Sequence, residues 1–285
     1  MKILVLGATG MLGSTMFKQL FADERYSVWG TTRSPSALTS FSEGERANLV
    51  SNVDVLDSDQ LISVFSKIKP DAVINCVGLI KQLSTAKDPM SVLPINSLLP
   101  HRLAKLCELC DSRLIQISTD CVFSGRKGMY TENDISDAED IYGKSKYLGE
   151  VVDSKSVVTL RTSIIGHELN STFSLVDWFL SQSGSVKGFA KAIFSGLPTV
   201  ELSRVVRDFV LPNSELSGLY QVAAKPIDKF SLLNLISITY KKKIEIVRDE
   251  SLIIDRSLDP SKFQAATGYV APSWAELIDC MYRIR

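Results

Sequence analysis

Histidine and cysteine are scarce in this chain of 285 residues, and their scarcity excludes several kinds of site. The chain has two histidines and five cysteines. The cysteines are odd in number and lie in apolar surroundings, which favours free thiols in a reducing compartment over a disulfide framework. Cys107 and Cys110 have the C-x-x-C spacing, but no second pair accompanies them. We therefore predict neither a metal site nor a redox site.

Long apolar runs and an excess of one charge are also missing. No uncharged apolar run approaches the roughly 18 residues that a membrane helix needs, and glycines interrupt the first apolar run too early for a signal peptide. Lys plus Arg equals Asp plus Glu at 32 each, so no broad basic surface for nucleic acid is expected. The sequence predicts a cytoplasmic protein with no membrane and no nucleic-acid partner.

A glycine-rich turn follows the first predicted strand, residues 2–6. The turn reads Gly7-Ala-Thr-Gly10-Met-Leu-Gly13, and apolar residues at helix spacing come after it. Strand, glycine turn and helix is the context of dinucleotide binding, in which a pyrophosphate lies on the helix N-terminus. The alternative is an ordinary tight turn. We expect the turn to contact the cofactor through Gly7, Thr9, Gly10, Met11, Leu12 and Gly13.

Arg33 follows the second predicted strand, residues 27–32. At this position an acidic residue would hold a ribose 2′-hydroxyl, whereas an arginine suits a 2′-phosphate. Asp23 and Glu24 come too early to take the acidic role. The sequence therefore favours NADPH over NADH, with NADH still possible. The alternative is an exposed loop arginine.

Apolar strand patterns alternate with helical patterns through the first 162 residues, and apolar residues make up 45% of the chain, enough for a sizeable core. This alternation predicts an α/β fold with a parallel, doubly wound Rossmann sheet, whose ligands lie beyond the strand carboxyl ends. The expected strands are 2–6, 27–32, 49–56, 71–77, 114–118 and 156–162, with helices over 59–67, 94–110 and 140–152 and a loop over 34–48. At these strand ends we expect further cofactor contacts from Asp54, Val55, Cys76, Val77 and Gly78.

The pattern changes after Thr162. Helices are expected over 171–180, 199–211 and 231–240, strand-like runs over 218–223 and 243–247, and a loop over 189–198. We interpret this part as a smaller region that closes over the cleft. The predicted division is a dinucleotide-binding domain, 1–164, and a substrate-binding region, 165–285, partly interleaved with it.

Tyr142 and Lys146 stand four residues apart, so on a helix they share one face. Asp137 or Asp140 is a possible cap of that helix. An ammonium near a phenol favours the phenolate, and we expect Lys146 to lower the pKa of Tyr142 toward the range of an acid–base catalyst. Alone, this spacing is common by chance on solvent-exposed helices. The glycine turn and the polar residues at the strand ends support a functional role for the pair. Thr119 is delivered to the end of the fifth predicted strand.

These residues together resemble the extended short-chain dehydrogenase/reductase family, and within it the dTDP-4-dehydrorhamnose reductase branch. The matching stretches are Gly7 to Gly13, Ile117-Ser-Thr-Asp-Cys-Val-Phe123, Tyr142-Gly-Lys-Ser-Lys-Tyr-Leu-Gly-Glu150 and Leu160-Arg-Thr-Ser163. The resemblance implies that Tyr142 protonates a keto oxygen while NAD(P)H delivers hydride. It also implies that Lys146 holds the nicotinamide ribose and that Thr119 hydrogen-bonds the keto oxygen. The implied activity is reduction of a nucleotide-activated 4-keto-6-deoxy sugar for surface polysaccharide.

Three positions depart from that branch: Ile164 replaces a tryptophan, Cys121 replaces a tyrosine, and the loop from Gly78 to Lys81 differs. The substrate is therefore open and includes N-acetylated UDP sugars. Candidate substrate contacts, besides Thr119 and Tyr142, are Lys81, His167, Glu201 and Arg256, and a cation near the diphosphate suits Lys81 or Arg256.

Two other functions stay open: a nucleotide-sugar epimerase or dehydratase that keeps NAD bound, and a non-catalytic NADP-binding regulatory subunit. A Thr-Asp-Glu set is usual in the dehydratases, and Cys121 after Asp120 weighs against that option. The expected partners are a nucleotide sugar and possibly a second copy of the chain in a homodimer.

Overall fold

A seven-stranded sheet, in which every pair of neighbouring strands is parallel, forms the centre of the computed structural model, which describes residues 1–81, 87–169 and 171–284. The strand order is β11-β6-β5-β4-β1-β2-β3. The strands are β1 (Lys2–Leu6), β2 (Ser27–Thr31), β3 (Leu49–Val50), β4 (Ala72–Asn75), β5 (Arg113–Thr119), β6 (Val157–Thr162) and β11 (Gly218–Gln221). The order reverses between β1 and β4, which is the crevice where doubly wound sheets bind ligands. The predicted fold class is confirmed.

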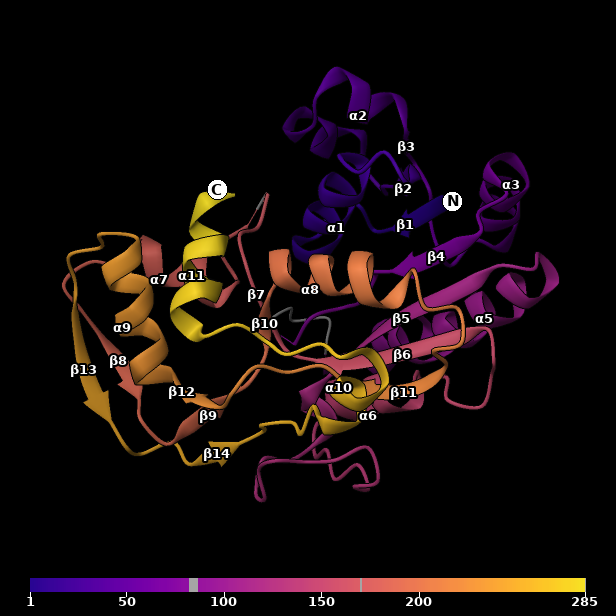
Figure 1. The fold of residues 1–285 in the computed structure, drawn as a ribbon. Helices are drawn as coiled ribbons and strands as arrows, with labels where there is room; N and C mark the ends of the chain where they lie inside the picture. The colour runs from indigo at the N-terminus through magenta and orange to yellow at the C-terminus, as the bar shows by residue number, and fades with distance from the viewer. Residues whose placement is uncertain (82–86, 170, 285) are drawn as a thin grey trace.

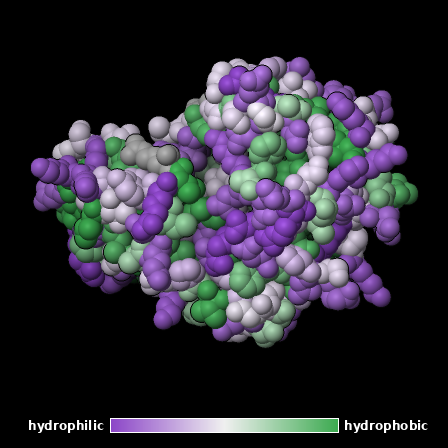
Figure 2. Space-filling model, turned by 45° about the horizontal axis from the view of Figure 1, so that its top comes forward, coloured by the Kyte–Doolittle hydropathy of each residue, from purple (hydrophilic) through white to green (hydrophobic). Residues whose placement is uncertain are grey.

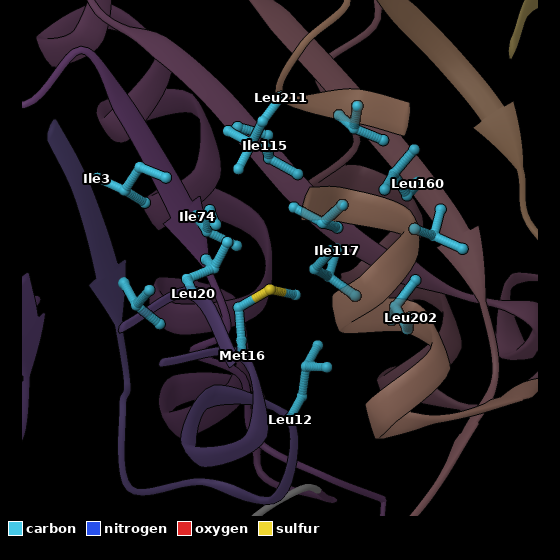
Figure 3. Close-up of a cluster of buried hydrophobic side chains, with 14 of the residues drawn as sticks. Ile3, Leu12, Met16, Leu20, Ile74, Ile115, Ile117, Leu160, Leu202 and Leu211 are labelled. Carbon is cyan, nitrogen blue, oxygen red and sulfur yellow. The ribbon is translucent and has the colours of Figure 1, made fainter. Parts of the chain in front are cut away.

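Successive strand residues point to opposite faces of the sheet, and each face has its own apolar core. Ile3 and Val5 of β1 belong to a core that includes side chains of α1 (Met11–Phe21) and α8 (Thr199–Val205). Leu4 and Leu6, from the same strand, belong to a core with α3 (Ser58–Ile68) and α5 (Leu99–Leu109). Figure 3 shows the first core, where the sheet side chains meet those of α1 and α8. Helices therefore cover both faces, as the strand periodicity requires.

The part of the chain after β6 forms a smaller unit beside the sheet, with a third apolar core (Figure 1). Its elements are β7 (Ile164–Ile165), α7 (Leu175–Ser181), β8 (Ser185–Phe189), β9 (Ala192–Phe194), β10 (Leu197–Pro198), β12 (Ile227–Asp228), α9 (Lys229–Thr239), β13 (Glu245–Asp249), β14 (Ile254–Asp255) and α11 (Trp274–Arg283). Three later segments return to the main sheet: α8 packs on α1, β11 pairs with β6, and α10 (Ser261–Thr267) packs on β11 and adds Phe263 to the first core. The division after residue 164 stays a prediction.

Two expectations for residues 34–56 are wrong. The expected loop contains a 3₁₀ helix, η1 (Pro35–Ser40), and a short helix, α2 (Glu43–Ala47). The helix begins at a capping box in which Ser42 and Glu45 each bond the other's backbone N–H. The expected third strand ends at Val50, because Asn52 takes a positive φ of 61° that turns the chain.

Other expected boundaries also shift. The expected helix over 94–110 is a helical run from α4 (Pro89–Leu93) through a π-helical turn, η3 (Pro94–Leu98), into α5. The expected helix over 140–152 is α6 (Ile141–Leu148), which ends at Gly149. The expected loop over 189–198 contains the short strands β9 and β10, which pair with distant segments. Short strands of two or three residues carry too little periodicity to be recognised in a sequence.

Within residues 1–81, 87–169 and 171–284, every helix is too short or too polar to span a bilayer. Figure 2 shows one face of the molecule, where hydrophilic residues form a broad area near the middle and hydrophobic residues lie in smaller areas.

Candidate functional site

The glycine turn between β1 and α1 brings bare backbone to the crevice of the sheet. A Cβ at Gly13 would lie 2.0 Å from the Gly7 carbonyl oxygen, and Gly7 has a φ of +77°. Only glycine fits this approach. The cap at Gly10 makes no side-chain hydrogen bond, and the first turn of α1 has no acidic residue. The first backbone N–H groups of α1 therefore form a positive end that suits a phosphate.

Arg33 and Asp54 lie at neighbouring strand ends on one side of this turn. Thr9 and Thr32 are joined through their hydroxyls at 3.3 Å, and Val53 N–H donates to the Thr32 carbonyl oxygen at 3.1 Å. Arg33 is exposed, and its guanidinium has no hydrogen bond or ion pair within the described ranges. This side of the turn therefore offers a free cation beside an acidic loop.

The end of β4 packs against the other side of the turn. A Cβ at Gly7 would lie 2.9 Å from a methyl group of Val77. A Cβ at Gly78 would lie 3.9 Å from the Lys146 Nζ and 3.5 Å from Asn96 Oδ1. The predicted cofactor residues of β1 and β4 thus come together, and Lys146 lies beside them.

Two glycines let α6 lie close to its neighbours, the turn after β5 and the π-helical turn η3. A Cβ at Gly143 would be 2.2 Å from the Cys121 carbonyl oxygen, and one at Gly149 would be 1.9 Å from the Asn96 carbonyl oxygen. Of the two expected caps, Asp140 is the one that begins α6, since it accepts a hydrogen bond from Gly143 N–H at 2.8 Å. Asp137 instead accepts from Ser124.

Lys146 is buried, and its Nζ donates to the Ile117 carbonyl oxygen on β5 at 2.9 Å. Burial lowers the pKa of Lys146 to about 8, while the Glu150 carboxylate opposes that shift. The amine is thus fixed at the end of the sheet and close to its own titration near neutral pH.

The phenol of Tyr142 does not behave as the sequence led us to expect. Burial raises the pKa of Tyr142, neighbouring Cys121 adds to the rise, and a hydrogen bond with Thr119 opposes it. The expected lowering by Lys146 is not among the dominant effects, because the ammonium is turned to the Ile117 carbonyl oxygen. The phenol therefore holds its proton at neutral pH, which suits a proton donor.

Thr119 lies between these groups and the turn that follows β5. Its hydroxyl accepts from Cys121 N–H at 3.1 Å and donates to Asp120 Oδ1 at 3.1 Å. Asp120 is buried, and burial raises the pKa of its carboxyl while Arg256 opposes the rise. Sequence reasoning placed Thr119 correctly at the strand end, but it gave no role to Asp120, which controls the direction of that hydroxyl.

Two of the four additional substrate candidates face this strand end. Lys81 pairs with Asp140, the cap of α6, at 2.6 Å. Arg256 donates to the Phe123 carbonyl oxygen at 2.7 Å and lies 3.9 Å from the Cys121 sulfur. Both residues thus lie against the segments that carry Tyr142 and Thr119.

Lys229, the first residue of α9, was missed. Burial lowers the pKa of Lys229, and Asp120 is the largest opposing influence. Its ammonium has no hydrogen-bond partner among the residues described. A lysine at a helix start gives no sequence signal of its own, because only the fold brings it toward Asp120.

His167 and Glu201 are engaged by other side chains. The nitrogens of His167 lie 2.6 Å from Asp177 and 2.8 Å from the hydroxyl of Tyr240. Glu201 is buried, pairs with Arg204 at 2.7 Å and accepts from the Tyr269 hydroxyl at 2.8 Å. These contacts leave neither residue a free polar atom that points to a substrate role.

Asn96 was also missed. It lies on the π-helical turn η3, and its side chain accepts from Leu79 N–H at 2.9 Å and donates to the Leu79 carbonyl oxygen and the Ser145 hydroxyl at 3.1 and 3.2 Å. It therefore ties the segment after β4 to α6. Helical periodicity continues through the turn, so the sequence pattern did not reveal it.

The described residues contain no group of three or more His, Cys, Asp or Glu side chains that could hold a metal ion. All five cysteines are free thiols. The polar side chains gathered near the glycine turn and the end of β5 include the phenol of Tyr142, the amine of Lys146 and the hydroxyl of Thr119.

Two known proteins are similar to this chain in sequence. A dTDP-4-dehydrorhamnose reductase of Aggregatibacter actinomycetemcomitans is 26% identical over 79% of this chain and 74% of its own length. Methionine adenosyltransferase 2 subunit beta of Danio rerio is 31% identical over 52% of this chain. That match spans only 42% of the length of the zebrafish subunit.

A solved structure and a family model extend the likeness over most of the chain. The dTDP-4-dehydrorhamnose reductase of Bacillus anthracis, solved in complex with NADP, superposes with a TM-score of 0.82 at 20% identity and covers 100% of this chain and 99% of its own. At that identity the superposition shows the shared fold alone. The family model described as RmlD substrate binding domain matches residues 1–223. The chain therefore belongs to the RmlD substrate binding domain family.

Proposed function

We propose that this protein is an NAD(P)H-dependent reductase of a nucleotide-activated 4-keto-6-deoxy sugar, of the dTDP-4-dehydrorhamnose reductase type. The observation that carries the proposal is the meeting of Tyr142, Thr119 and Lys146 beside the glycine turn. Such a product would serve deoxysugar and surface polysaccharide synthesis.

The crevice fits a dinucleotide cofactor. The glycine turn leaves backbone N–H groups at the start of α1 for the pyrophosphate, and no acidic side chain opposes it there. Arg33 is free to bind a 2′-phosphate, which favours NADPH over NADH. We assign Asp54 and Val55 to the adenine side of the cofactor, and Cys76, Val77 and Gly78, which lie between Gly7 and Lys146, to its nicotinamide side.

The chain's own residues then transfer one proton to the substrate. Tyr142 keeps its proton until a ketone is bound and gives it to the keto oxygen, so that the ketone becomes an alcohol. Thr119 donates a hydrogen bond to the same oxygen once its hydroxyl turns from Asp120 to the ketone. Lys146 lies one helical turn from Tyr142, to stabilise the phenolate and hold the ribose. The cofactor, when bound, supplies the hydride that reaches the carbonyl carbon.

The anionic diphosphate of the substrate requires cations near the strand end. We assign Arg256 and Lys81 to this role, as the sequence suggested, and add Lys229, whose ammonium has no acceptor among the described residues. His167 and Glu201 remain weaker candidates because their polar atoms already have partners.

Other parts of the proposal concern the whole protein. Free cysteines suit a reducing compartment, so we place the protein in the cytoplasm. A homodimer, and a functional division into residues 1–164 and 165–285, are carried forward as proposals.

A direct assay separates the proposed reductase from its alternatives. The protein is mixed with dTDP- and UDP-linked 4-keto-6-deoxy sugars, including N-acetylated ones, and NADPH absorbance is followed. We expect one NADPH oxidised for each carbinol formed. Product without net oxidation would identify an epimerase or dehydratase. NADPH binding with no turnover of any sugar in the panel would favour the regulatory subunit.

Replacing Tyr142 with Phe tests the proton donor. Turnover should fall at least ~100-fold, because the phenol is the acid, while the Kd for NADPH stays within about threefold of the wild type. Tyr147→Phe, an exposed tyrosine of the same helix, is the matched control and should leave turnover unchanged. Wild-type turnover in the Tyr142→Phe variant would refute the assignment.

Replacing Arg33 with Gln tests the cofactor preference. The Kd for NADPH should rise about tenfold, as expected for the loss of a charge-assisted phosphate contact, and the Kd for NADH should not change. Fluorescence titration measures both constants. Arg102→Gln, an exposed arginine on α5, is the control. An equal loss for the two cofactors, or tighter NADH than NADPH binding in the wild type, would remove the inference.

A further inference from the structure

A buried ion pair lies directly behind Lys146. Arg161 on β6 binds the Glu150 carboxylate through two nitrogens, at 2.7 and 2.6 Å. The two side chains are only 2% and 3% exposed. The Arg161 guanidinium also lies over the Phe123 ring at 5.1 Å. No role in the reaction follows from the sequence for either residue.

The pair is connected to Lys146 through one short stretch of β5. Ile117 supplies the carbonyl oxygen that accepts from Lys146 Nζ at 2.9 Å. Ser118, the next residue, donates its hydroxyl to Glu150 Oε1 at 2.6 Å and is the register partner of Arg161. Glu150 follows Lys146 by four residues. A movement of the pair would therefore move the strand segment and helix end that hold the amine.

A contribution to fold stability alone does not explain the buried Glu150–Arg161 ion pair. Arg161 Nη1 is buried without a partner, and so are both polar atoms of the Gln221 side chain, although Gln221 is the register partner of Arg161 on β11. Buried ion pairs with unsatisfied atoms are poor stabilisers compared with apolar side chains of similar size.

The charges around Lys146 come from few groups. On its own helix are Tyr142, whose pKa burial raises, and then Glu150 just beyond the helix end. On β4 the Cys76 thiol has its pKa raised by burial to about 12, so it is uncharged near neutral pH. Farther along the packed elements are Asp120, on the turn after β5, and Arg161 on β6, which contacts Glu150. Glu150 is the largest influence that opposes the effect of burial on Lys146.

We propose that Glu150 and Arg161 are positioning residues for Lys146. The Glu150 carboxylate keeps the buried ammonium charged. Arg161 holds that carboxylate in place and, as a cation, weakens its attraction for the ammonium. The inference rests on the proposed function, because it gives the charged amine its task beside a cofactor ribose. It predicts the direction in which each substitution shifts the pH at which Lys146 loses its proton. A pair that only stabilises the fold would not give opposite shifts. Removing the negative charge should make Lys146 lose its proton at lower pH, and removing the positive charge should make it do so at higher pH.

The experiment follows the Lys146 side-chain NMR signal against pH in Glu150→Gln, Arg161→Gln and the double variant. The signal is identified by its absence in Lys146→Arg. The wild-type midpoint is expected at pH about 8. Glu150→Gln should lower it by about half a pH unit or more, Arg161→Gln should raise it by a similar amount, and the double variant should lie between them. Glu108→Gln, which removes an exposed carboxylate paired with Lys105, is the control and should not shift it.

Opposite shifts in the two single variants support the inference, and shifts in one direction or no shift overturn it. If Glu150→Gln does not fold, Arg161→Gln and the neutral double variant carry the test, and the double variant must titrate below Arg161→Gln. The Kd for NADPH is measured over the same pH range and should rise with pH through the same midpoint. If Lys146 titrates as expected but the protein binds no NADPH at any pH, the inference stands and the proposed function fails.

Discussion

The hydrogen bond from the buried Lys146 ammonium to the Ile117 carbonyl oxygen is the contact on which the site depends. It requires α6 to lie against the segment after β5, and Gly143 permits that approach because a Cβ there would meet the Cys121 carbonyl oxygen, while Gly149 permits the approach to Asn96 on η3. Gly78, after β4, has no side chain beside this amine, and a Cβ there would lie 3.9 Å from Lys146 Nζ. The parallel order of the sheet brings these segments to one edge.

Burial, more than pairing of opposite charges, sets the protonation states of the site. Sequence reasoning expected the lysine to make the phenol more acidic, but burial raises the pKa of Tyr142 and lowers that of Lys146. A reductase gives a proton to its substrate, so a phenol that holds its proton until a ketone arrives is suited to the task. In the proposed mechanism, the Lys146 ammonium acts when the phenolate forms, because a cation stabilises the phenolate.

Local patterns predicted β1, the glycine turn and α1, because strand, turn and helix follow one another in sequence. The strand ends that carry Thr119 and Gly78 followed from the parallel alternation. The capping box of α2 was present in the sequence at Ser42 and Glu45 but was passed over in favour of a loop. Lys229 was beyond reach, since only the tertiary fold carries a residue 110 positions from Thr119 toward the same strand end.

The central claim is that a hydride and a proton reach a keto sugar in this crevice, the proton from Tyr142. Transfer of deuterium from NADPH labelled at the nicotinamide C4 tests it most directly, with mass spectrometry of the sugar product. The account predicts one deuterium on the new carbinol carbon, from one face of the nicotinamide only. A carbinol without deuterium from either labelled face would contradict it.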